Sequence, residues 1–318
     1  MTGAATGMGV ARMRLAIIGQ QAFGKAALDA FRDRGDTVAG VFVAPEPAGA
    51  KPDPIRARAE ELGIPVFQFQ RYSSDEALAT MRGLGVDLGV MAYVTQFVPQ
   101  SFVTIPKHGT IQFHPSLLPA HRGPSSINWP IILGKPETGL SIFRPVDGLD
   151  EGPVLLQKRV PIGPDDTLGS IYFDKIFPQG IAALLEAADL VLAGRALEQT
   201  QDERNATYEG WVREGEARIA WAQHVDVTYN LIRGCNPQPG AWTVADGKRL
   251  QIFDARKITA RVFGVVKGLK LGEVAAITAE GFTVHGQGGF IEVLRCRLDK
   301  GAKVAAKDAG IAPGTVLE

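Results

Sequence analysis

The feature that most constrains this fold is a regular alternation of short apolar runs with longer segments of helical periodicity, beginning at Arg14. Residues 15–19 form an apolar run that fits a buried strand, and residues 22–34 follow with apolar side chains at helical spacing. Further strands are expected at 37–43, 65–69, 88–92 and 109–113, and further helices at 55–62 and 75–83. Strands that alternate with helices in this way predict a parallel, doubly wound α/β sheet.

The texture of the sequence changes in its last third. A long amphipathic helix is expected over 176–193, and the polar stretch 195–205 reads as a linker. Beyond it, Asp246-Gly247 stands between two apolar runs, which predicts a β-hairpin, and glycine-rich turns flank further apolar runs. We therefore expect a flexible leader at 1–12, an α/β domain at 13–205 and a small β-barrel domain at 206–318.

Composition excludes several classes of partner. Lys plus Arg and Asp plus Glu both number 34, so there is no overall basic charge to attract nucleic acid or a membrane surface. The longest apolar stretches have strand length, and Met1–Arg12 lacks the pattern of a signal peptide, so we expect a cytoplasmic protein without a membrane partner. The two cysteines, Cys235 and Cys296, are expected to be reduced packing residues.

Two common cofactor sites are not expected. The turn Gly19–Gly24 follows a strand and opens a helix, but its spacing is not GxGxxG, so a dinucleotide site is disfavoured. No pair of histidines has the spacing of metal ligands, so we expect no metal. The spacing of the turn Gly19–Gly24 also disfavours a nicotinamide cofactor, so none is expected.

The stretch 110–123 carries the residues best suited to chemistry. A strand there delivers Gln112 and His114 to the same side, because side chains alternate along a strand. Pro115 ends the strand, so His114 stands at its carboxyl end, where open α/β sheets bind their ligands. The later acidic, glycine-rich loop 144–152 includes Asp150, which we expect to reach the same crevice.

An amide, an imidazole and a carboxylate together suit acyl transfer. Attack on a carbonyl places negative charge on its oxygen, and protons must move between the nucleophile and the leaving group. His114 could donate to the oxyanion or shuttle the proton, Asp150 could orient the ring, and Gln112 could donate a second hydrogen bond. Taken singly, each has a plainer interpretation: His114 as a structural histidine, Asp150 as a turn residue.

Other residues of the same segments also allow plain interpretations. His121 and Arg122 could form a solvated loop pair, and Ser116 could cap the loop through its hydroxyl. Ser116 is a weak candidate for a nucleophile, because no GxSxG turn surrounds it.

Two motifs in combination favour the functional interpretation over the plain one. The sequence Gln112-Phe113-His114-Pro115-Ser116-Leu117-Leu118-Pro119, followed by Asp147-Gly148-Leu149-Asp150-Glu151-Gly152, resembles the 10-formyltetrahydrofolate-dependent formyltransferase family. The resemblance extends over nearly the whole chain from Met13. It implies a Rossmann-like formyltransferase domain with His114 and Asp150 as the catalytic pair, and a C-terminal OB-like domain.

The resemblance also implies a folate site. The pterin ring would occupy an apolar slot built by residues 90–97 and closed by the loop 146–151, and 10-formyltetrahydrofolate would be the co-substrate. The residues expected to bind it are Met91, Ala92, Tyr93, Val94, Phe97, Val146, Asp147, Gly148 and Leu149. One position departs from the family, since most of its transferases carry Asn where this chain has Gln112.

The formyl acceptor is left open by the sequence. Several segments, among them Gly123–Trp129, look like the hydrolase domain of formyltetrahydrofolate dehydrogenase, which favours water, a small amine or a thiol. Methionyl-tRNA formyltransferase is the alternative, but the loop 44–51 holds one Lys and one Glu, whereas tRNA phosphates call for a basic cluster. A sugar-nucleotide amine and a non-catalytic folate-binding protein are further alternatives.

Overall fold

The computed structural model describes residues 12–259 and 268–318, so the expected leader lies outside the described residues except for Arg12. The chain divides into two compact units. The first comprises Met1–Arg122, Gly139–Arg159 and Ile176–Thr207, and the second comprises Gly123–Thr138, Val160–Lys175 and Tyr208–Glu318. Two segments that precede residue 205 thus pack with the later part of the chain, and the single domain boundary expected there stays a prediction.

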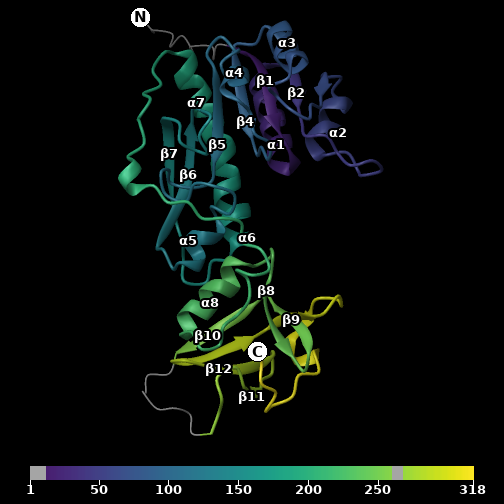
Figure 1. Ribbon diagram of the computed structural model, residues 1–318, viewed down its shortest axis with the longest axis vertical. Helices are drawn as coiled ribbons and strands as arrows, with labels where there is room; N and C mark the ends of the chain where they lie inside the picture. The colour runs from purple at the N-terminus through teal and green to yellow at the C-terminus, as the bar shows by residue number, and fades with distance from the viewer. Residues whose placement is uncertain (1–11, 260–267) are drawn as a thin grey trace, which may run out of the picture. The chain divides into compact units, whose positions relative to one another are not determined.

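A seven-stranded sheet forms the centre of the first unit (Figure 1). Its strands lie in the order β3-β2-β1-β4-β5-β6-β7. They are β1 (Arg14–Gly19), β2 (Thr37–Phe42), β3 (Val66–Phe67), β4 (Leu88–Ala92), β5 (Thr110–His114), β6 (Glu137–Phe143) and β7 (Val154–Pro161). The first five are parallel, as the alternation of strands and helices predicts.

Beyond the strands covered by that alternation, β6 runs antiparallel to β5. A parallel strand would need a connection that crosses back over the sheet, usually through a helix. The helix between the two strands, α5 (Asn128–Ile132), instead packs against α8 (Val225–Gly234) within the second unit. The chain therefore leaves β5 and enters β6 at the same edge of the sheet.

Helices cover both faces of this sheet. They are α1 (Gln21–Arg34), α2 (Pro54–Glu61), α3 (Asp75–Leu84), α4 (Gln100–Val103) and α7 (Phe177–Leu192). Helices α1 and α7 contact each other, and the ring of Phe23 in α1 stacks on Phe113 of β5 at 4.3 Å. Gly180 of α7 permits this packing, because a Cβ there would stand 2.6 Å from the Phe113 ring.

The opposite face carries a second apolar cluster, in which Ile18 and Met91 of the strands pack with Met81 of α3 and Phe102 of α4. Side chains alternate along β5, and Phe113 points toward α1 and α7. Gln112 and His114 therefore lie on the α3 and α4 face. A short 3-10 turn, η2 (Glu203–Asn205), follows α7 in this unit.

The second unit contains two antiparallel four-stranded sheets, in the orders β10-β13-β12-β11 and β15-β14-β9-β8. The strands are β8 (Ala241–Ala245), β9 (Lys248–Ile252), β10 (Ala255–Thr259), β11 (Val274–Ile277), β12 (Phe282–Gly286), β13 (Gly289–Val293), β14 (Arg295–Leu298) and β15 (Val304–Ala305). Asp246-Gly247 turns between β8 and β9, as expected. The small barrel-like domain predicted for the end of the chain is confirmed.

Helix α8 packs on β10 and β13, and one apolar cluster of helix and strand side chains fills the space between them. The remaining elements are α6 (Leu168–Ser170), the π-helix η1 (Ile171–Ile176), which leads directly into α7, and the 3-10 turn η3 (Ala306–Asp308). None of the described helices combines the length and hydrophobicity that a bilayer crossing requires.

Candidate active site

His114 ends β5 and is 6% exposed. Its Nε2 lies 2.9 Å from the backbone carbonyl oxygen of His121. A carbonyl oxygen only accepts hydrogen bonds, so Nε2 carries a hydrogen and donates it. The backbone of His121 is itself fixed, because its N–H donates to Oγ1 of Thr207 at 2.8 Å. The orientation of the His114 ring is thus set by the loop that follows its own strand.

Asp150 lies against the other nitrogen of the ring. Its Oδ2 is 3.5 Å from Nδ1 of His114, and Asp150 is 8% exposed. Since Nε2 is a donor, Nδ1 carries either a lone pair in the neutral ring or a second N–H in the imidazolium. The structure therefore brings together the two residues that the sequence predicts. The ring nitrogen that faces the carboxylate is Nδ1, the one not engaged with the His121 carbonyl.

The loop between His114 and His121 is held by hydroxyl groups. Ser116 Oγ donates to the carbonyl oxygen of Ala120 at 2.7 Å, and Ser141 Oγ donates to the carbonyl oxygen of Ser116 at 2.7 Å. The backbone N–H of Leu118 donates in turn to Ser141 Oγ. Ser116 caps the loop, as its plain interpretation expects.

Gln112 is half-buried on β5, paired in register with Met91 on one side and Phe143 on the other. Among the residues that the structure describes, none forms a hydrogen bond with the side chain of Gln112. The amide of Gln112 therefore lies on the same face as His114 with its donor capacity unused by those residues.

The residues expected to bind the pterin lie at the end of β4, in the loop that follows it, and in the loop that carries Asp150. Met91 and Ala92 are buried at the end of β4, whereas Tyr93, Phe97 and Leu149 are 47%, 67% and 58% exposed. Val94, Val146 and Gly148 are half-buried. Three large apolar side chains among the expected pterin residues are thus exposed to solvent.

A capping hydrogen bond joins these two loops. Oδ1 of Asp147 accepts the backbone N–H of Gln100 at 2.8 Å, at the start of α4. The acidic loop that carries Asp150 is therefore held against the loop that follows β4. A carboxylate at this position also satisfies one of the free N–H groups at the start of the helix.

Comparison with known proteins fits this geometry. A family model described as "Formyl transferase" matches residues 13–187, more than half of the 318-residue chain. The chain belongs to the formyl transferase family. A second model, "Formyl transferase, C-terminal domain", matches residues 212–310 of this family member. The resemblance drawn from the two motifs is confirmed.

Relatives of this formyl transferase carry different names. The human mitochondrial 10-formyltetrahydrofolate dehydrogenase is 38% identical over 287 residues, which cover 87% of this chain but only 31% of that protein. Methionyl-tRNA formyltransferase from Geotalea uraniireducens (strain Rf4) is 35% identical over 317 residues, 97% of this chain and 99% of that protein. The crystal structure of HypX from Aquifex aeolicus in complex with tetrahydrofolic acid shares the fold, with a TM-score of 0.67 at 18% identity, covering 95% of this chain and 48% of that one.

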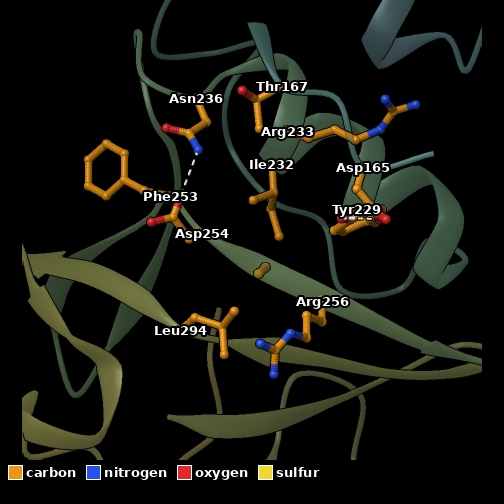
Figure 2. Close-up of a pocket in the computed structure, with 11 residues that line it drawn as sticks. Asp165, Thr167, Tyr229, Ile232, Arg233, Asn236, Phe253, Asp254, Arg256 and Leu294 are labelled. Carbon is orange, nitrogen blue, oxygen red and sulfur yellow. Dashed lines mark hydrogen bonds between the residues drawn. The ribbon is translucent and has the colours of Figure 1, made fainter. Parts of the chain in front are cut away.

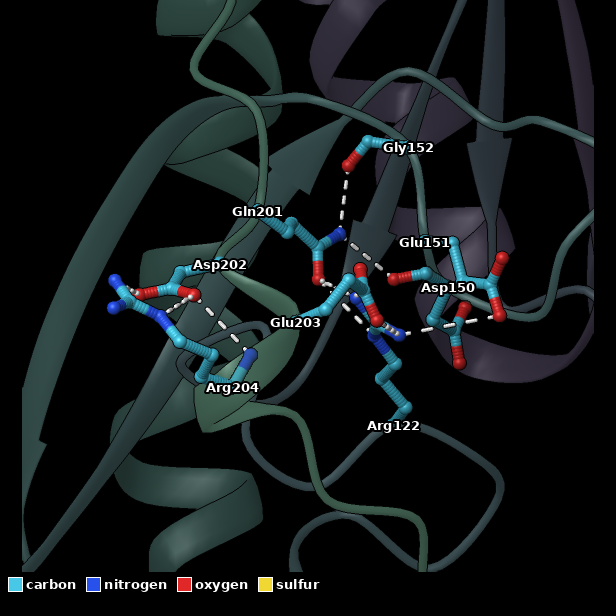
Figure 3. A network of polar contacts seen from close by, with 8 residues as sticks. All are labelled: Arg122, Asp150, Glu151, Gly152, Gln201, Asp202, Glu203 and Arg204. Atoms are coloured by element: carbon cyan, nitrogen blue, oxygen red, sulfur yellow. Dashed lines mark hydrogen bonds and ion pairs between the residues drawn. The ribbon is translucent and has the colours of Figure 1, made fainter.

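His121 and Arg122 correct the interpretation of a solvated loop pair. His121 is 8% exposed and Arg122 only 1% exposed. The guanidinium of Arg122 bonds Gln201 and Glu203, which belong to the polar stretch that the sequence indicates as a linker (Figure 3). Polar composition concealed these partners, because a buried side-chain network leaves no periodic signal in a sequence.

The cysteines behave as expected. Cys235 and Cys296 are both free and buried, and burial raises the pKa of their thiols to about 12 and about 11. Both stay protonated at neutral pH and act as small packing side chains. Within residues 12–259 and 268–318, there is no group of three or more His, Cys, Asp or Glu side chains arranged to hold a metal ion.

The second unit has a cavity of about 390 Å³ that no sequence motif marks (Figure 2). The Tyr229 hydroxyl donates to Asp165 at 2.8 Å within it, and Asn236 donates to Asp254 at 3.0 Å. Burial, followed by the contact with Asp165, raises the pKa of Tyr229 to about 12, so the phenol stays neutral. Four of the lining polar residues thus pair with one another.

Proposed function

We propose that this chain transfers the formyl group of 10-formyltetrahydrofolate to water or to a small nucleophile such as an amine or a thiol, and releases tetrahydrofolate. Membership of the formyl transferase family and the likeness to a structure solved with tetrahydrofolic acid support folate as the carrier. The observation that carries the proposal is the buried contact between Nδ1 of His114 and Asp150 at the carboxyl end of β5.

In the proposed reaction the nucleophile attacks the formyl carbon, and the carbonyl oxygen gains negative charge in a tetrahedral intermediate. The protonated ring of His114 and the amide of Gln112 stabilise that charge. The carbon–nitrogen bond to N10 then breaks, N10 takes a proton, and the nucleophile loses one. With water as nucleophile the products are formate and tetrahydrofolate.

The contacts of His114 support one of its ring nitrogens as the atom that transfers protons. Nε2 is engaged with the carbonyl of His121, so Nδ1 is the nitrogen that exchanges protons. Asp150 faces Nδ1 and stabilises the charged ring while the tetrahedral intermediate exists. Because both side chains are shut off from solvent, this ionic contact is stronger than it would be in water.

The proposed folate site follows the expected residues. Buried Met91 and Ala92 form the floor of the slot, and the exposed rings of Tyr93 and Phe97 with Leu149 offer apolar surface to the pterin. Val94, Val146, Asp147 and Gly148 complete its walls. We further propose that residues 13–205 carry this reaction and that 206–318 form the accessory domain.

Methionyl-tRNA is the second candidate acceptor, favoured by the end-to-end match with a methionyl-tRNA formyltransferase. The loop after β2 argues against it. Burial opposes the ionisation of Glu46 there, but hydrogen bonds from the Asp53 N–H, Gln68 and Arg56 outweigh burial and lower its pKa to about 2. Arg56 is thus ion-paired with a carboxylate of this loop, and phosphate contacts need free cations.

One assay tests the proposal and separates the candidates. The protein is mixed with 10-formyltetrahydrofolate, and release of tetrahydrofolate is followed alone, with small amines or thiols, and with methionyl-tRNA. Release without an added acceptor, or with a small one, is the expected result. Release only with methionyl-tRNA would move the assignment to the second candidate. Tight folate binding without release under every condition would make the chain a folate-binding protein.

A further inference from the structure

Gln201 joins the loop that follows His114 to the loop that carries Asp150. It is 7% exposed, and its amide nitrogen donates to the carbonyl oxygens of Asp150 at 2.8 Å and of Gly152 at 2.7 Å. Its amide oxygen accepts from Nε of Arg122 at 3.1 Å and from Nη2 at 2.8 Å (Figure 3). A side-chain amide has two N–H groups and two lone pairs on its oxygen. Gln201 therefore uses its full hydrogen-bonding capacity between Arg122 and the loop that carries Asp150.

Each end of this bridge adjoins one member of the pair. Arg122 follows His121, whose carbonyl oxygen orients the ring of His114. Asp150 has a φ of 57°, a left-handed conformation that a non-glycine residue holds only when its surroundings enforce it. The bond from Gln201 to the Asp150 carbonyl supplies such a constraint. An unbroken series of contacts therefore runs from the ring of His114 through Gln201 to the backbone of Asp150.

We infer that Gln201 is a positioning residue that sets the distance between Nδ1 of His114 and the carboxylate of Asp150. This inference rests on the proposed function. Gln201 touches neither reacting group through its side chain, so it acts through the two loops. Misplacing a reacting group by about 1 Å can cost on the order of a hundredfold in rate, so a bridge between the loops controls turnover directly.

Charge balance alone does not account for Gln201. Arg122 is already paired with Glu203, whose oxygens lie 2.9 and 2.6 Å from Nη1 and Nη2, and Glu151 lies 3.9 Å away. A glutamate at position 201 would add charge to that pairing but would turn an oxygen toward two carbonyl oxygens. A neutral amide is the group that satisfies the arginine on one side and both carbonyls on the other.

The second unit offers a matched control. Gln251 is 6% exposed, and its amide oxygen accepts from Nε and Nη2 of Arg297 at 2.8 and 2.5 Å. Its amide nitrogen donates to the Pro239 carbonyl at 3.2 Å. Gln251 thus reproduces the arginine–glutamine pair without contacting a loop that carries His114 or Asp150. The substitutions Gln251→Leu and Gln251→Glu report what the loss of such a pair costs by itself.

The experiment compares Gln201→Leu and Gln201→Glu with the two Gln251 variants in the full chain. We expect kcat for tetrahydrofolate release to fall about 10- to 100-fold at position 201, and to stay within about threefold at position 251. The ring-nitrogen NMR signals of His114, assigned with His114→Asn, should shift in the Gln201 variants and stay in place in the Gln251 variants. A general loss of stability would not move them selectively.

Gln201 variants with near-normal kcat and an unmoved His114 signal would overturn the inference. So would equal losses of kcat at positions 201 and 251. Gln201→Glu keeps the acceptor toward Arg122, so it carries the comparison where Gln201→Leu fails to fold. The NMR signal needs no turnover, and it therefore decides the positioning role even if the wild-type protein releases no tetrahydrofolate, which would refute the proposed function alone.

Discussion

Two histidine–aspartate pairs in this chain have nearly the same local geometry and very different settings. In the first unit, Nδ1 of His114 lies 3.5 Å from Asp150, with the two side chains 7% and 8% exposed. In the second unit, Nδ1 of His224 lies 3.2 Å from Asp226, with side chains 47% and 50% exposed. Distance alone would rank the second pair first.

The difference lies in what each pair does for the backbone. His224 precedes α8, and its Nδ1 accepts the N–H of Asp226 at 3.2 Å, so the ring caps the helix. Asp226 also pairs with Lys257. His114 instead ends a strand, Asp150 lies in a distant loop, and the two side chains meet where they are largely buried and a charge is costly unless the site uses it. Burial and convergence of distant segments, rather than proximity, distinguish a candidate catalytic pair.

The largest expected effect is a loss of turnover when the buried pair is substituted and none when the exposed histidine is. His114→Asn or Asp150→Asn should lower kcat for tetrahydrofolate release by about 10²- to 10⁴-fold, since proton transfer by a positioned side chain contributes that much. His224→Asn should leave kcat within about threefold of wild type. Folate binding, measured by fluorescence or calorimetry, should persist in all three variants. Near-normal turnover in both first-unit variants would refute the assignment of the pair.

A smaller loss of turnover is expected when the amide of Gln112, on the same face as His114, is removed. Gln112→Leu should lower kcat by about 10²-fold, the usual loss when one oxyanion donor is removed. Gln112→Asn retains an amide and should recover much of that loss. Both are measured as tetrahydrofolate release at saturating 10-formyltetrahydrofolate. A leucine variant as fast as wild type would show that the half-buried amide does not reach the formyl oxygen.

The sequence predicted the elements of the first unit well, because helical and strand periodicities there reflect burial against one sheet. Strand β4 was expected at 88–92 and lies at Leu88–Ala92. The antiparallel direction of β6 does not follow from the sequence, since periodicity says nothing about which way a strand runs. The sequence also predicts no element over residues 171–175, where the structure has most of the π-helix η1.

Site residues that belong to a local motif can be predicted from the sequence, whereas residues that act through contacts distant in sequence cannot. His114 follows from a strand that ends at a proline, and Asp150 from a glycine-rich acidic loop. Gln201 has no such signal, because its function depends on two carbonyl groups that are distant in sequence. Arg122 was interpreted as solvated for the same reason, although its guanidinium is buried.

A smaller effect again tests whether the exposed pair is purely structural. Asp226→Asn should lower the free energy of unfolding at pH 7 by about 0.3–1 kcal/mol, since it removes a charge from the first turn of α8 and an exposed ion pair with Lys257. Urea denaturation measures this loss. In a Lys257→Gln background the same substitution should cost less. A loss of several kcal/mol would mean that the pair does more than cap a helix.

The smallest effect concerns the pH dependence of that stability. The hydrogen bond from Lys257, which outweighs burial, lowers the pKa of Asp226 below its ordinary value of 3.8. The unfolded chain therefore binds this proton more readily than the folded chain, so the contribution of Asp226 is complete well above that value and is lost as the pH falls through the folded pKa. The stability gap between wild type and Asp226→Asn should narrow from about pH 5 to about pH 3. Lys257→Gln removes the cause of the shift and should flatten this dependence. A constant difference in the free energy of unfolding over that range would contradict this prediction. It would mean that the ion pair of Asp226 with Lys257 does not stabilise α8.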